Sequence, residues 1–324
     1  MPRTLPLRAA PLAGESLDSW LEVLCNRMDS QWNDVLRRVG LPVEPHRRYA
    51  KSWMIRLTPE QAGSLNVATG VDEARLHEMT LGHLGGLLSQ NSPLPAESMS
   101  TMLWLRARRS RFCPQCLADS RGRWQLWWRS RWAFACADHR CLLVDVCPAC
   151  GQTQRDKPTP AGFIPTPGLC TAKRAAGGAV RLCGYPFADA AASPLNASGA
   201  VIQSQAVILR SMSAELIAEG VYESSPIGAG QLIPDLAALG GRILAYADPV
   251  ELIQLLPEDL IDRYRTSPAI GEAGLREFTA ADADSGDRII DKLYQRGVEQ
   301  MSQGELPAAL REFARARHLG GESV

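Results

Sequence analysis

The chain has 324 residues, which is enough for two or three modules that each have their own core. Hydrophobic residues make up 45% of it, a content typical of folded protein. No apolar run of about 18 residues is present and the first residues lack the apolar core of a secretory signal, so we expect a soluble, cytoplasmic protein without a membrane segment. In that compartment clustered cysteines are more often metal ligands than disulfides.

The net charge is zero, but the charges are unevenly distributed. Residues 188–324 carry 20 acidic and 11 basic side chains, which leaves 15 acidic and 24 basic ones in residues 1–187 out of 35 of each. The net positive charge of residues 1–187 therefore favours binding of a polyanion, whereas the net negative charge of residues 188–324 does not. Such an asymmetry indicates contact with nucleic acid or docking of the two halves on each other.

Residues 1–100 are predicted to be helical. Ser16 is a candidate N-cap for a helix that carries apolar residues at helical spacing up to Met28, and a second helix is expected over residues 32–39. Thr58-Pro59-Glu60-Gln61 has the pattern of a capping box with proline in the first turn, so a helix should begin there and end at Gly70. Asp72 can cap the next helix.

Two helices around Gly70 have the outline of a helix-turn-helix. The second helix would expose Glu73, Arg75, His77 and Glu78, a set poorly suited to phosphates. An αα-hairpin that only packs is therefore the alternative to a DNA-reading element.

Linker-like sequences suggest three domains. "NSPLPAES" at 91–98 and "ADAAASPLNASG" at 188–199 are rich in turn residues. We expect a helical N-terminal domain at 1–100, a double metal-binding module at 101–187 and a helical domain at 188–324, whose last two helices resemble one tetratricopeptide-type hairpin. The predicted fold class is mostly α with an embedded pair of zinc-finger or zinc-ribbon modules.

Cysteine spacing is the most specific signal in the chain. Two-residue gaps allow two side chains of one tight turn to reach the same ion, and structural zinc takes four sulfur or nitrogen ligands. The spacing predicts two zinc ions, one held by Cys113, Cys116, Cys136 and His139, the other by Cys147, Cys150, Cys170 and Cys183. Cys141 is an alternative fourth ligand, and Cys25 is expected in the core.

Three other readings of the cysteines fit less well. A redox pair of thioredoxin type belongs beside a βαβ pattern, which the sequence lacks. A catalytic zinc keeps one open position, whereas each set here reaches four protein ligands. A zinc deaminase needs H-x-E followed by P-C-x-x-C, and neither is found. We therefore expect structural sites and no enzyme.

Arginines and tryptophans are concentrated around the first cysteines. Arginine favours bidentate contacts to phosphate, and a two-residue step would place pairs of them on one face of a strand. The predicted DNA-contacting residues are Arg106, Arg108, Arg109, Arg111, Arg121, Arg123, Arg129 and Arg131. The alternative is that these arginines line the rim of a small core of Trp124, Trp127, Trp128 and Trp132 or stack on it.

Four motifs in this order resemble the TniQ family, the target-selection proteins of transposons related to the TnsD group. They are "PLAGESLDSWL" at Pro11–Leu21, "FCPQCLAD" at Phe112–Asp119, "CADHRCLLVDVCPACG" at Cys136–Gly151 and "LCGYPF" at Leu182–Phe187. The family's zinc ligands map by position onto the eight residues named above. The family often closes the second site with two nearby cysteines, whereas Cys170 and Cys183 are 13 positions apart.

The resemblance implies a non-enzymatic adaptor for DNA targeting in transposition. Such a protein recognises DNA or an RNA-guided complex and recruits an AAA+ ATPase regulator, which brings in the transposase. A homodimer is implied by family analogy only. The alternative is a zinc-stabilised scaffold that binds proteins and makes no direct contact with DNA.

Overall fold

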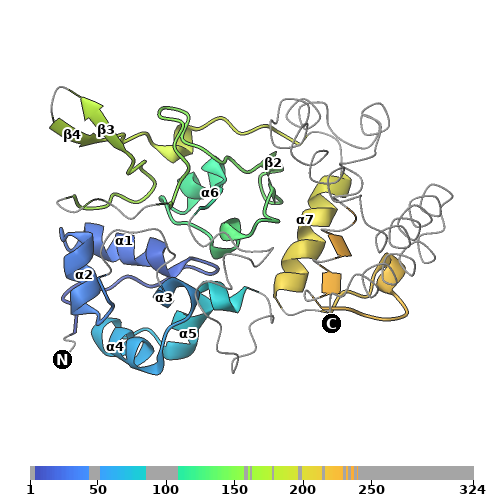
Figure 1. The fold of residues 1–324 in the computed structure, drawn as a ribbon, viewed down its shortest axis with the longest axis horizontal. Helices are drawn as coiled ribbons and strands as arrows, with labels where there is room; N and C mark the ends of the chain where they lie inside the picture. Colours follow the sequence, from blue (N-terminus) through green and yellow to red (C-terminus); the bar gives the residue numbers. More distant parts are fainter. Residues whose placement is uncertain are drawn as a thin grey trace, which may run out of the picture. The chain divides into compact units, whose positions relative to one another are not determined.

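The computed structural model describes residues 4–43, 52–84, 109–156, 160, 163–176, 179–195, 199–213, 216–228 and a few positions up to 239. Within these residues the chain is mainly helical with two small hairpins (Figure 1). The described residues up to Leu216 belong to one compact unit, and Ile217–Ile227 belong to a second.

Five helices lie in the described N-terminal residues 4–43 and 52–84, which we call the helical domain (residues 4–84). They are α1 (Leu17–Arg27), α2 (Trp32–Arg38), α3 (Ser52–Ile55), α4 (Pro59–Thr69) and α5 (Glu73–Glu78), followed by the short 3-10 helix η1 (Leu81–His83). Their apolar faces form one core, in which Trp20, Leu24, Leu65 and Leu76 are fully buried. Cys25 lies in this core, as predicted.

Local signals placed α1, α2, α4 and α5 correctly, whereas the short helix α3 was not expected. Ser16 occupies the N-cap position of α1, although its side chain makes no capping hydrogen bond. At α4 the capping box is complete, because Gln61 N donates to Thr58 Oγ1 and Thr58 N donates to Gln61 Oε1. Gly70 ends α4 with φ of 75°, a left-handed conformation that favours glycine.

The α4–α5 pair forms the predicted hairpin, with a second helix of only six residues. Arg75 is held within the helical domain, where it donates to Glu78 Oε2 and to the carbonyl oxygen of Leu12. Glu73, His77 and Glu78 are exposed, as expected. The geometry of this hairpin fits the packing alternative.

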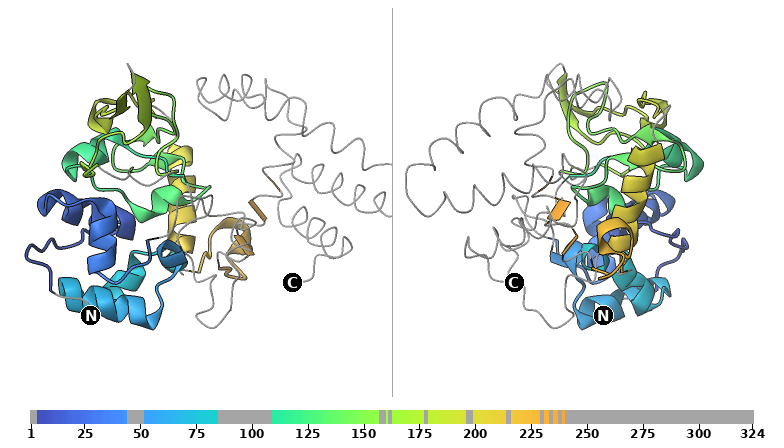
Figure 2. Two further views of the ribbon diagram at one scale, coloured as in Figure 1. Left: turned by 60° about the vertical axis from the view of Figure 1, so that its left-hand side comes forward. Right: turned by 90° about the vertical axis from the view of Figure 1, so that its right-hand side faces the viewer.

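A second core lies in what we call the cysteine-rich module (residues 109–195). Its elements are α6 (Pro114–Asp119), the 3-10 helices η2 (Leu126–Arg129) and η3 (Phe187–Asp189), and two antiparallel hairpins, β1 (Ala135–Cys136) with β2 (Cys141–Leu142) and β3 (Lys173–Ala176) with β4 (Ala179–Leu182). Phe112, Trp124, Trp128 and Phe187 pack ring against ring in its centre. The tryptophans of this segment thus serve mainly as core, and Figure 2 shows the module beside the helical domain from two directions.

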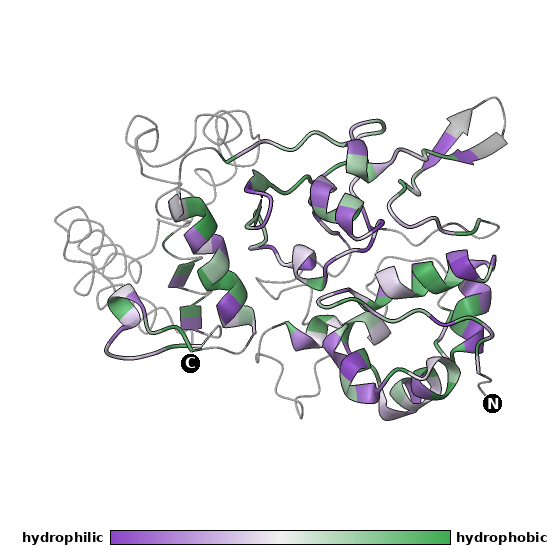
Figure 3. Ribbon diagram, turned by 180° about the vertical axis from the view of Figure 1, so that it is seen from behind, coloured by the Kyte–Doolittle hydropathy of each residue, from purple (hydrophilic) through white to green (hydrophobic). Residues whose placement is uncertain are grey.

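Residues beyond the predicted boundary at residue 187 make hydrogen bonds with the β1–β2 hairpin of the module. Leu142 N donates to the carbonyl of Ser193, and Leu195 N donates to that of Arg140. Helix α7 (Gly199–Met212), which mixes hydrophobic and hydrophilic residues along its length (Figure 3), is anchored by Gln205, whose Oε1 accepts from the amides of Phe134 and Ala135.

The second unit is described only in part. It contains the 3-10 helix η4 (Gly220–Tyr222) and a β-bridge between Ile217 and Ile227. The tetratricopeptide-type hairpin expected from the last two helices of the chain lies outside the described residues. Among the described helices, none combines the length and apolarity needed to cross a membrane.

Candidate metal centres

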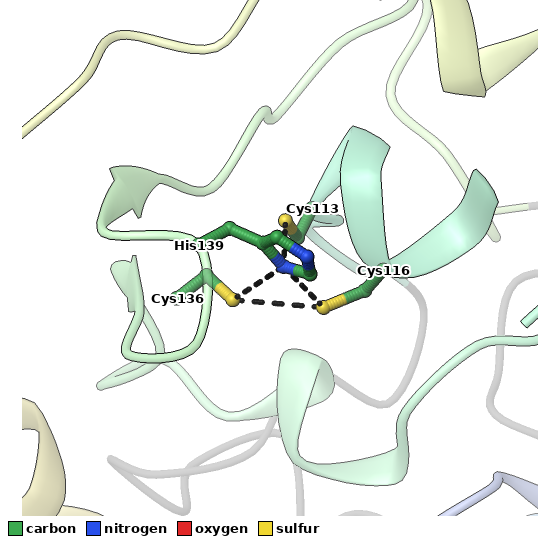
Figure 4. A group of neighbouring side chains, drawn as sticks. All are labelled: Cys113, Cys116, Cys136 and His139. Atoms are coloured by element: carbon green, nitrogen blue, oxygen red, sulfur yellow. Dashed lines mark hydrogen bonds between the residues drawn. The ribbon is translucent and has the colours of Figure 1, made fainter. Parts of the chain in front are cut away.

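The first candidate centre gathers three thiols around one imidazole nitrogen. Nδ1 of His139 lies 3.5 Å from Cys113 Sγ, 3.2 Å from Cys116 Sγ and 3.5 Å from Cys136 Sγ, as Figure 4 shows. A tetrahedral zinc with bonds of about 2.3 Å to sulfur and about 2.0 Å to nitrogen would separate sulfur and nitrogen by about 3.5 Å. The ligand atoms therefore stand at the spacing that one ion requires.

Two local structures supply these ligands. Cys113 is the N-cap of α6, Pro114 fills the first helical position, and Cys116 follows on the same turn, so the Cys-Pro-x-Cys sequence itself begins the helix. Cys136 and His139 come from β1 and from the turn before β2, where Arg140 has φ of 48°. Helix and hairpin each contribute two ligands.

Asp119 adds a contact that sequence reasoning missed. Its Oδ2 lies 3.1 Å from Nε2 of His139, on the opposite side of the ring from the thiols. A metal-bound histidine commonly donates its second N–H to a carboxylate, which fixes the tautomer and orients the ring. Asp119 stands three residues after Cys116, at the end of the same short helix, and this spacing is the signal that could have found it.

Cys141 lies beside the first centre but outside the four-ligand group. Its Sγ is 3.7 Å from that of Cys113, and it pairs with Cys136 across the β1–β2 hairpin. The group whose ligand atoms all lie within 4.8 Å of one another consists of Cys113, Cys116, Cys136 and His139. The geometry thus favours His139 over Cys141 as the fourth ligand.

The second candidate centre brings together the other four predicted cysteines. Sγ of Cys147 is 3.9 Å from that of Cys183, and Sγ of Cys150 is 3.7 Å from that of Cys170. Four sulfurs around a tetrahedral zinc would be about 3.8 Å apart. All four ligand atoms lie within 4.8 Å of one another, so this set is also compatible with a single ion.

A hairpin explains the long gap between the last two ligands. Residues between Cys170 and Cys183 form β3 and β4, whose register pairs Lys173 with Leu182. At its base Cys170 N donates to the Tyr185 carbonyl, and Gly184 N donates back to that of Cys170. Cysteines 13 positions apart in sequence are therefore neighbours in space.

The chemistry of both donor sets calls for a cation. The pKa of the Cys136 thiol is raised to about 11, and its hydrogen bond with Cys113 is the largest cause. Burial raises the pKa of the Cys170 thiol. Thiols this close cannot all ionise without a positive charge between them, whereas a bound metal ion takes them as thiolates. Each set is closed by four protein ligands, which fits a structural metal and leaves no open position for catalysis.

Of the predicted DNA-contacting arginines that the structure describes, some are exposed and others lie inside the protein. Arg109, Arg121 and Arg131 are exposed, whereas Arg106 and Arg108 lie outside the described residues. Arg111 donates to Asp145 and to two backbone carbonyls, those of Arg131 and Ala133. Arg123 and Arg129 point into the protein, where they meet carboxylates of the helical domain.

The expected strand faces for these arginines are wrong. Residues 126–129 form η2, and Arg121 takes a left-handed conformation with φ of 55°. Neither the pair Arg121 and Arg123 nor the pair Arg129 and Arg131 therefore lies on an extended strand. Arg129 is 1% exposed while Arg131 is exposed, because the chain turns between them. Alternation along a strand does not apply here.

Buried ion pairs join the two domains along what we call the seam, formed by Gly14–Glu22 of the helical domain with Arg123–Arg129 and Arg155 of the module. Arg123 donates to Glu15 Oε2 at 2.8 Å, and Arg129 donates to Asp18 Oδ2. Arg155 donates to Asp18 Oδ2 and to Glu22 Oε2, each at 2.6 Å. Three arginines of the basic half are thus neutralised inside the molecule.

Asp18 is ionised at this seam. Burial alone would raise its pKa, but the guanidinium groups of Arg129 and Arg155 outweigh burial and hold the pKa well below its usual range. The acidic positions of "GESLDSWLE" are partly explained by this docking, since Glu15, Asp18 and Glu22 are its carboxylates.

Comparison with known proteins bears on the same region. The family model named TniQ matches residues 6–143, a range that covers nearly all of the helical domain, the seam except Arg155, and the first candidate centre, and that ends before Cys147. No curated protein matches the chain. The match agrees with the motifs that resemble this family, and it identifies the chain as a transposition-associated protein that carries a TniQ domain.

Proposed function

We propose that the chain is a non-enzymatic DNA-targeting adaptor of a transposition system, stabilised by two structural zinc ions. The TniQ match over residues 6–143 carries this proposal, since proteins of this family are targeting adaptors rather than enzymes. The protein would recognise DNA or a guide complex and recruit an AAA+ ATPase and, through it, the transposase. The two closed four-ligand clusters support a structural role for the metal.

Zinc would be held by Cys113, Cys116, Cys136 and His139 at the first centre and by Cys147, Cys150, Cys170 and Cys183 at the second. It supplies folding free energy to a module with little secondary structure, on the order of 10 kcal/mol per site in isolated fingers. Elemental analysis of the purified protein should find two zinc ions per chain. A zinc-free protein with an unchanged fold would contradict the assignment.

The DNA-contacting surface is best sought among the exposed arginines of the module. Arg109, Arg121, Arg131 and Arg140 are exposed. If they contact phosphates, replacing all four by glutamine should weaken binding to any duplex and reduce the slope of log affinity against log salt by about 3 to 4. Arg37→Gln is the matched control, because this exposed arginine of α2 pairs with Asp34 in the helical domain.

The alternative is a zinc-stabilised scaffold that binds only proteins. It is favoured by the fact that Arg111, Arg123 and Arg129 are engaged inside the protein. A gel-shift assay on duplex DNA and a pull-down with an AAA+ transposition ATPase separate the two functions. Capture of the ATPase without any salt-dependent binding to duplex would establish the scaffold and overturn direct DNA targeting.

A further inference from the structure

We propose that metal binding at the second centre locks the helical domain onto the cysteine-rich module, and that Arg155 transmits this effect. The inference rests on the proposed occupancy of Cys147, Cys150, Cys170 and Cys183, which metal content measures separately. Three observations lead to it.

Among the residues that the structure describes, the two domains do not share a hydrophobic core. Buried apolar residues form one cluster between Leu5 and Met79 and another between Phe112 and Ala190, with no member in common. The domains meet instead through polar groups. Ser16 N donates to the Trp124 carbonyl at 2.9 Å, and Leu126 N donates to that of Gly14 at 2.7 Å. Docking therefore depends on hydrogen bonds and charges rather than on a continuous apolar interior.

Arg155 is central to the charged part of this seam. One guanidinium group bridges Asp18 and Glu22, two carboxylates one turn apart on α1, while its carbon lies 4.6 Å from the centre of the Trp124 ring. The side chain is 8% exposed. It thus connects a helix of one domain with the aromatic core of the other.

The segment that carries Arg155 is the metal-binding knuckle itself. Cys147 N donates to the Gln152 carbonyl, Val146 bridges to Thr153, and Ser110 N donates to the carbonyl of Gln154. Arg155 follows five residues after Cys150 and takes a left-handed φ of 57°. The turn that presents two ligands to the ion therefore also directs Arg155 into the seam.

Loss of the metal removes the ligand bonds that tie this knuckle to Cys170 and Cys183, which flank the β3–β4 hairpin. Arg155 then loses its fixed position, and Asp18 and Glu22 lose a cation while they are still buried. Removing one partner of a buried ion pair is costly because the remaining charge is uncompensated. Undocking of the helical domain exposes these carboxylates to water and relieves that cost.

Hydrogen exchange on the full chain tests the proposal. The amides of Ser16 and Leu126 cross the seam, so peptides that contain them report docking, whereas peptides within α4 report the folding of the helical domain. Arg155→Ala should retain two zinc ions, speed exchange of the seam peptides by about tenfold or more, and leave α4 protected. Arg181→Ala is the control, since Arg181 is an exposed arginine of the same module.

The second arm removes the metal. Cys183→Ser should bind one zinc ion per chain and show the same faster exchange at the seam with α4 still protected. Stepwise chelation of the wild-type protein gives the same comparison if Cys183→Ser does not fold. Seam exchange equal to that of the wild-type protein after loss of the second zinc, or in Arg155→Ala, overturns the proposal. A wild-type protein with no metal at the second centre contradicts the zinc assignment and the proposed lock alike.

Discussion

Asp119 and His139 are joined across the imidazole ring, with Oδ2 of the carboxylate 3.1 Å from Nε2 while Nδ1 faces three thiols. The carboxylate is supplied by the last residue of α6, and Cys113 is the N-cap of the same helix. One short helix therefore positions two metal ligands and also orients a third.

Asp119→Ala should lower the zinc affinity of the first centre by about 10- to 100-fold, because the imidazole loses the acceptor that fixes its tautomer and orientation. Competition with a chromophoric chelator measures this affinity. Asp138→Ala is the matched control, since Asp138 is an exposed acid next to His139 in sequence and should leave the affinity unchanged. An equal effect of both changes would indicate a general charge effect instead.

Cys141→Ser should leave two zinc ions bound per chain, whereas His139→Ala should lose one or bind it far more weakly. The reason is geometric, since Nδ1 of His139 contacts all three other ligands while Cys141 lies beside Cys113. Elemental analysis of the two purified variants decides between them. The opposite pattern would make Cys141 the fourth ligand.

Gly122→Ala should destabilise the module by about 3 kcal/mol or more. Gly122 has φ of 83°, and a Cβ there would lie 2.4 Å from the backbone of Pro167 and Gly168, in the segment that leads to Cys170. Denaturant unfolding measures the loss. Gly184→Ala separates the two causes, because Gly184 has φ of 68° with open space around it and should lose only about 1 kcal/mol. Equal losses would show that the close approach at Gly122 contributes nothing.

Asp18→Asn should lower the free energy of unfolding by about 3 kcal/mol or more, since Arg129 and Arg155 would remain buried without this carboxylate. The folded-state pKa of Asp18 is held below its unfolded value of about 4, so its stabilisation is present above that pH and is lost as the pH falls further. The difference from the wild-type protein should therefore stay constant between about pH 8 and pH 5.5.

Unfolding curves at several pH values measure that difference. Asp34→Asn is the control, because Asp34 forms an exposed pair with Arg37 and should change stability by less than about 0.5 kcal/mol. A difference that disappears between pH 8 and pH 5.5 would mean that Asp18 is not held ionised by the arginines.

Short-range patterns in the sequence determined much of this protein. The capping box at Thr58 and Gln61, the left-handed stop at Gly70 and the Cys-Pro-x-Cys start of α6 depend only on neighbouring residues, so they could be predicted. The eight ligands could be assigned to two groups because two-residue gaps and a limit of four ligands restrict the choices. The four motifs likewise indicated the TniQ family that the comparison supports.

Tertiary structure alone decided which charges are buried. Arg129 and Arg131 look alike in sequence, yet one pairs with Asp18 inside the protein and the other is exposed. The partners of Arg123, Arg129 and Arg155 lie more than 100 positions away, and no local periodicity encodes contacts at that separation. From composition alone, each arginine is expected to be an exposed charge. Only the folded chain shows that Arg123, Arg129 and Arg155 are paired with carboxylates of the helical domain.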